Sequence, residues 1–305
     1  MDRREFLKTG IITGGAVAAS ALFKNNLLYA ARAGTVLYPD LVALRNAAPA
    51  AMFAKGIKAL GGMNRFVKNG SKVVIKPNVG WNKAPRYGAT TNPGLIKEII
   101  KHCQHAGAAK IYVFDHTCDF WKYSYKKSGI GPAVTAAGAQ MVPANSESYY
   151  ESVTLQKGKV LKQTKVHELI IDSDVFINVP VLKHHGSTQA TIAMKNLMGV
   201  VWDRSFYHRH NLHQCIADFC NYRLPDLNIV DAYTVMERNG PKGVSLDDIV
   251  IKKNQLISTD IVAADTAAAK ILGRDPDNIG YITKAAAMQL GEKNLRKLNI
   301  KKIVF

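Results

Sequence analysis

The sequence DVFINVPVLKHH, which occupies residues 174–185, is an apolar run that ends in three basic residues. A run of this length without polar alternation is typical of a strand that helices cover on both faces, as in a parallel sheet. Ligands of open α/β sheets bind outside the carboxyl ends of the strands, so basic residues at the end of a strand indicate a ligand-binding site. We therefore expect an α/β protein whose functional site lies at this edge of the sheet.

Strands and helices alternate along the rest of the chain. Further buried strands are predicted at residues 72–76, 110–114, 227–230 and 301–305. Two of the helices between them are predicted to begin directly after the capping residues Asn92 and Asp260. A small hairpin inserted on the main sheet is expected over residues 152–171. The pattern predicts a single α/β domain over residues 34–305, with a mostly parallel sheet and helices on both faces.

The chain of 305 residues is strongly basic, with 41 Lys and Arg against 23 Asp and Glu, a formal net charge of +18 at pH 7. Its hydrophobic fraction of 47% is ordinary for a globular protein and excludes a disordered, collagenous or coiled-coil chain. The positive charge predicts an anionic partner, either a small carboxylate or phosphate ligand or a phospholipid surface. Nucleic acid is not expected, because the basic residues are spread along the chain and no recognition motif is present.

Residues 1–33 resemble a twin-arginine (Tat) export signal. A paired arginine, Arg3-Arg4, with a Phe-Leu-Lys continuation precedes an uncharged run over residues 9–23, and residues 31–33 offer a small-x-small cleavage site. The run is shorter than the roughly 20 residues that span a bilayer. The resemblance implies the twin-arginine translocase as the partner during export and a periplasmic mature protein. An uncleaved signal would anchor the protein in the membrane.

The four cysteines do not suggest a disulfide or metal framework. None belongs to a CxxC pair, and Cys103 falls on the apolar stripe of a predicted helix. Cys215 and Cys220 are five residues apart, which places them on different faces of a helix. A ferredoxin-type iron–sulfur site is therefore not expected.

Polar side chains gather where the predicted strands end. They are Lys76 and Asn78, Asp115 and His116, Lys183 to His185, and Asp231. Because the carboxyl ends of parallel strands meet at one edge of a sheet, these residues predict one shared crevice. Each could instead cap the helix or turn that follows it, but four coincident strand ends favour the crevice.

Five of the nine histidines fall between Val179 and Pro225. Imidazole is the commonest metal ligand and also titrates near neutral pH, so this density indicates metal binding or acid–base chemistry. The candidate metal ligands are His185, His208 and His210. No HExxH motif is present, and the spacing of the last two favours a strand or loop over one helix face. A solvated surface loop stays open for these two histidines.

A helix predicted over residues 188–198, with Gly199 as its stop, would aim two polar side chains toward the same crevice. These side chains are Lys195 and Asn196. The candidate catalytic residues are Asp115, His116, Lys183 and Lys195. The candidate ligand- or cofactor-binding residues are Lys76, Asn78, Lys195, Asn196 and Asp231.

Seven short motifs occur in a fixed order between residues 76 and 241. They are KPN at 76–78, NP at 92–93, Asp115, NVPVLKHH at 178–185, KNLMG at 195–199, NIVD at 228–231 and NGP at 239–241. As an ordered set these motifs resemble the uncharacterised domain-of-unknown-function family 362 (DUF362), in its Tat-signal-bearing branch. The resemblance implies no established reaction. The ferredoxin-like cysteine segment of another branch is absent, so an iron–sulfur role is not carried over.

A looser resemblance is to the nickel-pincer lactate racemases, which place a strand-end His, a Lys that holds the cofactor covalently and another His in one crevice. His185, Lys195 and His208 or His210 have the same order here, whereas the glycine-rich racemase signature is missing. The resemblance implies a metal ion (nickel, iron or zinc) or a covalently held organic cofactor at Lys195 and His185, with Asp115 or a histidine moving a proton or hydride. Lys195 acts as a nucleophile only if burial or cationic neighbours suppress its charge.

Two functions stay open at this point. The leading hypothesis is a cofactor- or metal-dependent enzyme, of redox or isomerase type, that acts on a small anionic substrate in the crevice. The alternative is a non-catalytic periplasmic binding protein that holds an anionic ligand. Its candidate cations are Lys76, Arg86, Lys183 and Lys195.

Overall fold

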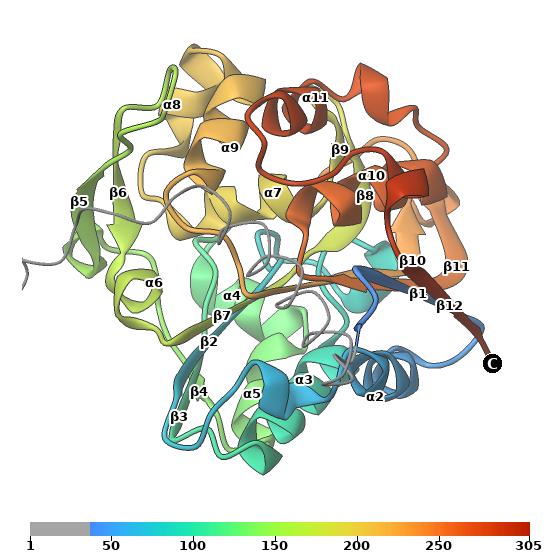
Figure 1. The fold of residues 1–305 in the computed structure, drawn as a ribbon. Helices are drawn as coiled ribbons and strands as arrows, with labels where there is room; N and C mark the ends of the chain where they lie inside the picture. The colour runs from blue at the N-terminus through green and yellow to red at the C-terminus, as the bar shows by residue number, and fades with distance from the viewer. Residues whose placement is uncertain (1–36) are drawn as a thin grey trace, which may run out of the picture. The chain divides into compact units, whose positions relative to one another are not determined.

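Within residues 37–305, the part of the chain that this computed structural model describes, ten strands form one sheet between two layers of helices (Figure 1). The predicted export signal at residues 1–33 lies outside the described residues. The strands of the sheet are β1 (Leu41–Arg45), β2 (Lys72–Pro77), β3 (Lys110–Val113), β4 (Gln140–Met141), β7 (Val175–Val179), β8 (Val181–His185), β9 (Gln189–Thr191), β10 (Leu227–Met236), β11 (Ile249–Ser258) and β12 (Ile300–Val304).

The sheet has the order β12-β1-β11-β10-β7-β2-β3-β4 and is mostly parallel. Strands β10, β7, β2, β3 and β4 run parallel to one another, and β12 runs parallel to β1. Strand β11 is antiparallel to both of its neighbours. The predicted α/β class with a mostly parallel sheet is confirmed.

Two hydrophobic cores lie on the two faces of the sheet, and alternate residues of β2 enter them. Val73 and Ile75 belong to one core and Val74 to the other, as the pleat of a strand requires. The first core is covered by α2 (Pro49–Ala59), α3 (Pro93–His105) and α5 (Ile130–Ala136). The second is covered by α7 (Ala193–Asn196), α9 (Leu212–Cys220), α10 (Ile261–Ile271) and α11 (Gly280–Ala287). No helix in the described part of the chain is both long and apolar enough to cross a membrane.

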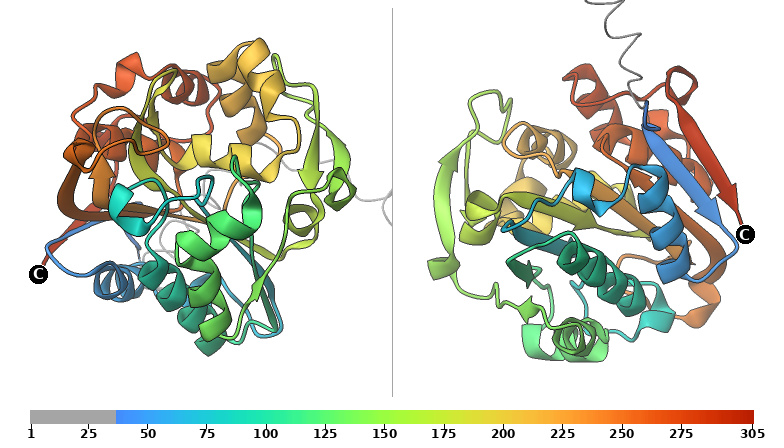
Figure 2. Two further views of the ribbon diagram at one scale, coloured as in Figure 1. Left: turned by 180° about the vertical axis from the view of Figure 1, so that it is seen from behind. Right: turned by 60° about the horizontal axis from the view of Figure 1, so that its bottom comes forward.

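The predicted hairpin exists, but it forms a separate two-stranded sheet from β5 (Tyr150–Thr154) and β6 (Gln163–His167), beside the main sheet (Figure 2). Residues 155–162 form its loop. The Asp218 carboxylate on α9 accepts the N–H groups of Val160 and Leu161, at 2.7 and 2.9 Å. These N–H groups are therefore hydrogen-bonded without pairing in a sheet.

The helix predicted over residues 188–198 is shorter than expected. Residues 189–191 form β9, which pairs with β8, and α7 begins only at Ala193. A 3-10 turn, η4 (Leu197–Val200), follows α7. The buried Asp265 carboxylate on α10 sets this start, because it accepts the N–H groups of Ala193 at 2.6 Å and Met194 at 3.1 Å.

A break between β7 and β8 at Pro180 opens the carboxyl edge of the sheet. Both strands pair with β10, first at Leu227 and Asn228 and then from Asp231 onward. Strand β2 follows β7 only as far as Val179, after which β8 turns away with β9. The Thr91 hydroxyl donates a hydrogen bond to the Val179 carbonyl, at 2.7 Å. Space therefore opens beyond the ends of β2 and β3.

Replacing Asp265 with Ala is expected to lower the free energy of unfolding by about 2–4 kcal/mol, because two buried N–H groups at the start of α7 lose their acceptor. Chemical denaturation measures the change. Asp172→Ala, at an exposed position that ends α6 (Glu168–Asp172), is the control and should change stability by about 0.5 kcal/mol or less. Equal stability of the two variants would contradict the anchoring role of Asp265.

Candidate functional site

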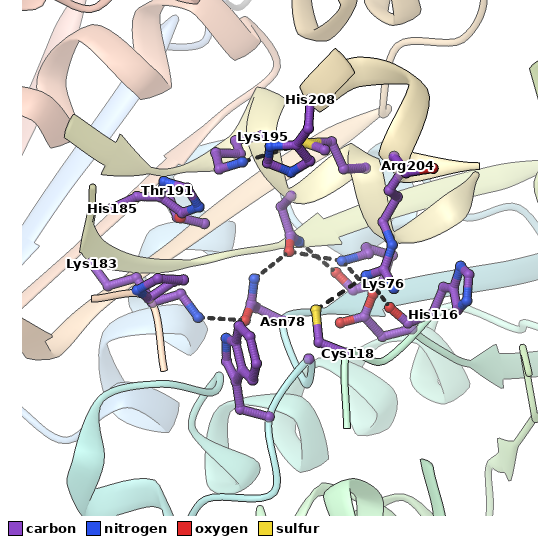
Figure 3. A pocket seen from close by; sticks show the side chains of 18 of the residues that line it. Lys76, Asn78, His116, Cys118, Lys183, His185, Thr191, Lys195, Arg204 and His208 are labelled. Atoms are coloured by element: carbon purple, nitrogen blue, oxygen red, sulfur yellow. Dashed lines mark hydrogen bonds and ion pairs between the residues drawn. The ribbon is translucent and has the colours of Figure 1, made fainter. Parts of the chain in front are cut away.

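A pocket of about 550 Å³ opens at the carboxyl ends of β2, β3 and β8, at the edge where β8 leaves β2 (Figure 3). We call it the strand-end pocket. Its polar lining includes Lys76, Asn78, Asp115, His116, Cys118, Lys183, His185, Thr191, Lys195, Asn196, Arg204 and His208. Three of the four strand ends that were expected to converge, and the KNLMG segment, meet at this pocket, whereas the fourth, at Asp231, does not.

The floor of the strand-end pocket is a buried ion pair. Lys76 is 1% exposed, and its Nζ lies 2.9 Å from the Asp115 carboxylate. The same Nζ donates to the Asn196 side-chain oxygen at 2.7 Å and to the Pro77 carbonyl at 2.9 Å, so all three ammonium protons are used. Burial lowers the pKa of Lys76, and the Asp115 carboxylate opposes that shift. Lys76 thereby links β2, the end of β3 and α7.

Gly199 packs directly against this ion pair. A Cβ at this position would collide with the Asp115 carboxylate and would lie 2.7 Å from the Lys76 Nζ. The second carboxylate oxygen of Asp115 accepts the Val79 N–H at 2.7 Å, so the carboxylate cannot rotate away without losing that bond. The glycine that ends the KNLMG motif is therefore required by close approach.

A chain of side-chain amides connects the ion pair to Lys183. Asn78 donates to the Asn196 oxygen at 2.9 Å, and Lys183 donates to the Asn78 oxygen at 3.0 Å. Lys183 also donates to the Ala89 carbonyl, at 2.6 Å. It is 1% exposed, and burial lowers its pKa to about 7. The Lys183 amine is therefore close to half neutral at neutral pH.

Lys195 has a different environment from the other two buried lysines. Its side chain is 7% exposed and points from α7 into the strand-end pocket (Figure 3). The only hydrogen-bond acceptor of its Nζ among the described residues is the Met198 sulfur, at 3.4 Å, and a thioether is a weak acceptor. Burial lowers the pKa of Lys195 to about 8.

Two of the three predicted metal ligands line the strand-end pocket. Burial lowers the pKa of His185 to about 3, with a further contribution from Lys195 and Lys183, so its imidazole is neutral. The pKa of His208 is also lowered by burial. In residues 37–305, no group of three or more His, Cys, Asp or Glu side chains is placed to hold a metal ion.

His210 is not in the pocket, and the expected strand or loop over residues 207–210 is wrong. Residues 204–209 form the short helix α8 (Arg204–Arg209). His208 lies in this helix and lines the pocket, whereas His210 comes after the helix has ended and does not. The exposed His210 ring instead stacks on Phe206, with 3.8 Å between ring centroids.

Asp231 and Arg86 also lie outside the strand-end pocket lining. The buried Asp231 carboxylate accepts the N–H groups of Asn92, at 2.7 Å, and Tyr233, at 3.1 Å. Burial raises its pKa to about 6. Asp231 therefore fixes the loop at the start of α3. The Arg86 guanidinium lies over the Tyr87 ring, 5.5 Å from its centroid.

Arg204 and Cys118, for which no role was predicted, also line the pocket. Arg204 donates to the carbonyls of His116 and Thr117, at 2.8 and 3.0 Å, and to the Cys118 sulfur at 3.4 Å. It thus holds the segment that follows β3. The only signal for Arg204 was its place in the histidine-rich run.

His116 is fixed on the same wall. Its ring stacks on Trp202, with 5.0 Å between centroids and 2° between planes, and its Nδ1 contacts the Val201 carbonyl at 3.0 Å. A carbonyl can only accept, so Nδ1 carries the proton and Nε2 is the basic nitrogen. Burial and Arg204 lower the pKa of His116.

Comparisons with known proteins found similarity to one curated relative and to two solved structures, among others. The thylakoid-associated protein sll1697 of Synechocystis is 26% identical over 244 residues, which cover 77% of this chain and 73% of that protein. The lactate racemase apoprotein of Thermoanaerobacterium thermosaccharolyticum has a TM-score of 0.46 at 11% identity, covering 78% of this chain and 57% of that one. A structural-genomics target from Thermotoga maritima has a TM-score of 0.44 at 10% identity, covering 78% and 58%. The chain thus spans less than two thirds of either solved protein, and these likenesses say nothing about activity.

The comparison with protein families matches residues 73–270 to the Domain of unknown function DUF362. The match covers more than half of the chain and includes every residue named above as lining the strand-end pocket. It agrees with the family that the ordered motifs resemble. This chain belongs to the DUF362 family.

Proposed function

We propose that this protein binds a small anionic substrate in the strand-end pocket and acts on it as an enzyme of isomerase or redox type. One observation carries the proposal, the surplus of cationic side chains in the pocket. Lys76, Lys183, Lys195 and Arg204 line it, whereas its carboxylates are Asp115, already bound to Lys76, and Asp203. Asp203 is half exposed and bound to Ser205 and Arg209. An anionic ligand would supply the missing counter-charge.

The lowered pKa values favour an enzyme over a non-catalytic binding protein. A protein that only holds an anion gains most from lysines that stay fully charged. Here burial lowers the pKa of Lys183 to about 7 and of Lys195 to about 8, and it keeps His185 neutral. Perturbed groups of this kind, gathered in one pocket, are typical of acid–base or nucleophilic catalysis at neutral pH.

The contacts support distinct roles for the candidate residues. Asp115 is engaged by Lys76 and by the Val79 N–H, so we propose that it positions the pocket rather than moving a proton. Lys183 and Arg204 hold the anionic group. His116, through Nε2, and Lys195 are the groups proposed to exchange protons with the substrate.

A cofactor is also part of the proposal. His185, Lys195 and His208, the residues that the looser resemblance assigns to a cofactor, line the same pocket. Two imidazoles are fewer than the three protein ligands of a typical catalytic zinc site, so a metal here would need a further ligand from an organic group or from the substrate. Such a group would supply hydride or redox chemistry that side chains lack.

Export and location are proposals as well. The paired arginine supports passage through the twin-arginine translocase into the periplasm. Contact with an anionic membrane surface is supported by the net charge of +18 and by the name of the thylakoid-associated relative.

A panel of small anions should contain at least one that raises the melting temperature of the purified protein and binds in calorimetry. We expect Arg204→Gln to weaken that binding about tenfold or more, because one charge-assisted contact is lost. Lys157→Gln, at an exposed position in the hairpin loop, is the control and should bind normally. If no carboxylate or phosphate stabilises the protein, the pocket does not bind small anions.

An anion found in that panel can be used to distinguish an enzyme from a non-catalytic binding protein. In D₂O, an enzyme that transfers protons should introduce deuterium at a carbon of its ligand, which mass spectrometry detects. The effect should vanish in Lys195→Met. Tight binding without exchange, and without conversion when redox cofactors are added, would instead favour the non-catalytic alternative.

Affinity for the anion should fall as pH rises from 6 to 9, because Lys183 and Lys195 lose their protons at pKa values of about 7 and 8. The ligand-free protein should show the opposite trend. A lysine whose folded pKa is lowered carries more protons in the unfolded state between about pH 7 and 10, so the free energy of unfolding rises with pH there. Calorimetry and denaturation across this range measure both. Lys183→Met should flatten each profile, and unchanged slopes in that variant would contradict the assignment.

Replacing Arg3 and Arg4 by Lys should retain the precursor in the cytoplasm, since the twin-arginine route depends on that pair. Cell fractionation with an antibody against the mature chain measures the distribution. Lys8→Arg, just beyond the pair, is the control. Unchanged export of the double variant would exclude this route.

A further inference from the structure

The three buried lysines of the strand-end pocket differ in how many of their N–H groups are already used. Lys76 has three oxygen partners, in Asp115, Asn196 and Pro77. Lys183 has two, in Asn78 and Ala89. Among the described residues, Lys195 has only the Met198 thioether. Lys76 is thus fully bonded into the wall of the pocket, Lys183 keeps one N–H for a ligand, and the Lys195 amine is the most available of the three.

Among the described residues, no oxygen acceptor holds the amine at position 195. The side chain is 7% exposed, and its Nζ contacts only the Met198 sulfur. A buried ammonium without an oxygen partner is costly, and this cost favours the neutral amine. With a pKa of about 8 for Lys195, on the order of 100-fold more of its amine is neutral at pH 7 than for an exposed lysine.

Hydrogen bonds to other elements hold the backbone around Lys195. Asp265 holds the first N–H groups of α7, and Asn196 is bonded to both Lys76 and Asn178. The backbone on either side of Lys195 is therefore anchored while its amine points into the pocket toward His208 (Figure 3). An anchored amine whose neutral form is favoured by burial and by nearby cations is the arrangement that a nucleophilic lysine needs.

We propose that Lys195 is a nucleophile that forms an imine with the carbonyl carbon of a small oxo acid, whose carboxylate is attracted by the cationic side chains of the same pocket, among them Arg204. This inference rests on the proposed function and names its substrate class. An oxo acid combines the two features that the pocket selects, an anionic group for the cations and an electrophilic carbon for the amine.

The step balances without any further reagent. The lone pair of the neutral Lys195 nitrogen forms the new C–N bond, while the electrons of the carbonyl double bond move to oxygen. The two hydrogens of the amine leave with that oxygen as water, and the C=N bond replaces the C=O bond. Nothing is oxidised or reduced, and protonation of the imine restores a positive charge at this position.

The test is reductive trapping on the purified full chain. Pyruvate and sodium cyanoborohydride are added at neutral pH, and intact mass followed by peptide mapping locates the adduct. We expect one reduced pyruvate adduct per chain, on Lys195, formed at least tenfold faster than any adduct on the exposed Lys157. No adduct, an adduct confined to Lys183, or equal labelling of many lysines would overturn the proposal.

Two variants separate this inference from the proposed function. Lys195→Arg keeps a positive charge but forms no imine, so it should lose the adduct and still be stabilised by pyruvate in a melting experiment. Lys157→Arg, at an exposed position in the hairpin loop, is the control and should retain the adduct on Lys195. If pyruvate or another anion stabilises the parent protein but no adduct forms, the imine is excluded and the anion site stands. If neither pyruvate nor any other anion stabilises it, the proposed function itself fails.

Discussion

The buried ion pair between Lys76 and Asp115 is the interaction on which the strand-end pocket depends. It joins the ends of β2 and β3, and through Asn196 it joins both to α7. A buried pair contributes little net stability, because desolvation offsets the attraction between the charges, but losing one partner leaves the other charge buried alone. The pair therefore determines which arrangement of these elements is allowed more than how stable the fold is. The glycine at position 199 belongs to the same constraint, since its missing Cβ leaves the room that the pair occupies.

Much of this edge could be predicted from the sequence, because its information is local. Apolar runs gave the strands β2, β3 and β7, and the polar residues directly after them converge where parallel strands end. Lys76, Asn78, Asp115 and Lys183 were identified in this way. The separate sheet of the hairpin could not be predicted in this way. The Asp218 carboxylate that binds the hairpin loop is distant in sequence.

The errors have the same origin. The helix expected from residue 188 begins at 193 because Asp265, on another helix, accepts the first N–H groups. Asp231 was expected at the end of a strand, but β10 continues to Met236, and the Asp231 carboxylate binds Asn92 and Tyr233 inside the protein. His210 was grouped with His208 by spacing, which indicates a shared face only if the secondary structure is known. Arg204 had no motif to mark it, and only the fold brings it to the segment after β3.

The three lysines show how one pocket can contain both a scaffold and a reactive group. Lys76 and Lys183 are bonded into the wall, so their ammonium groups stabilise the pocket's shape and set its positive potential. That potential acts on Lys195, whose own contacts do not hold its charge. Burial and neighbouring positive charge both favour the neutral amine, and the same positive charge attracts an anionic ligand. The positive charge that disfavours a protonated Lys195 would therefore also bring a substrate to it, beside an amine that burial makes more reactive.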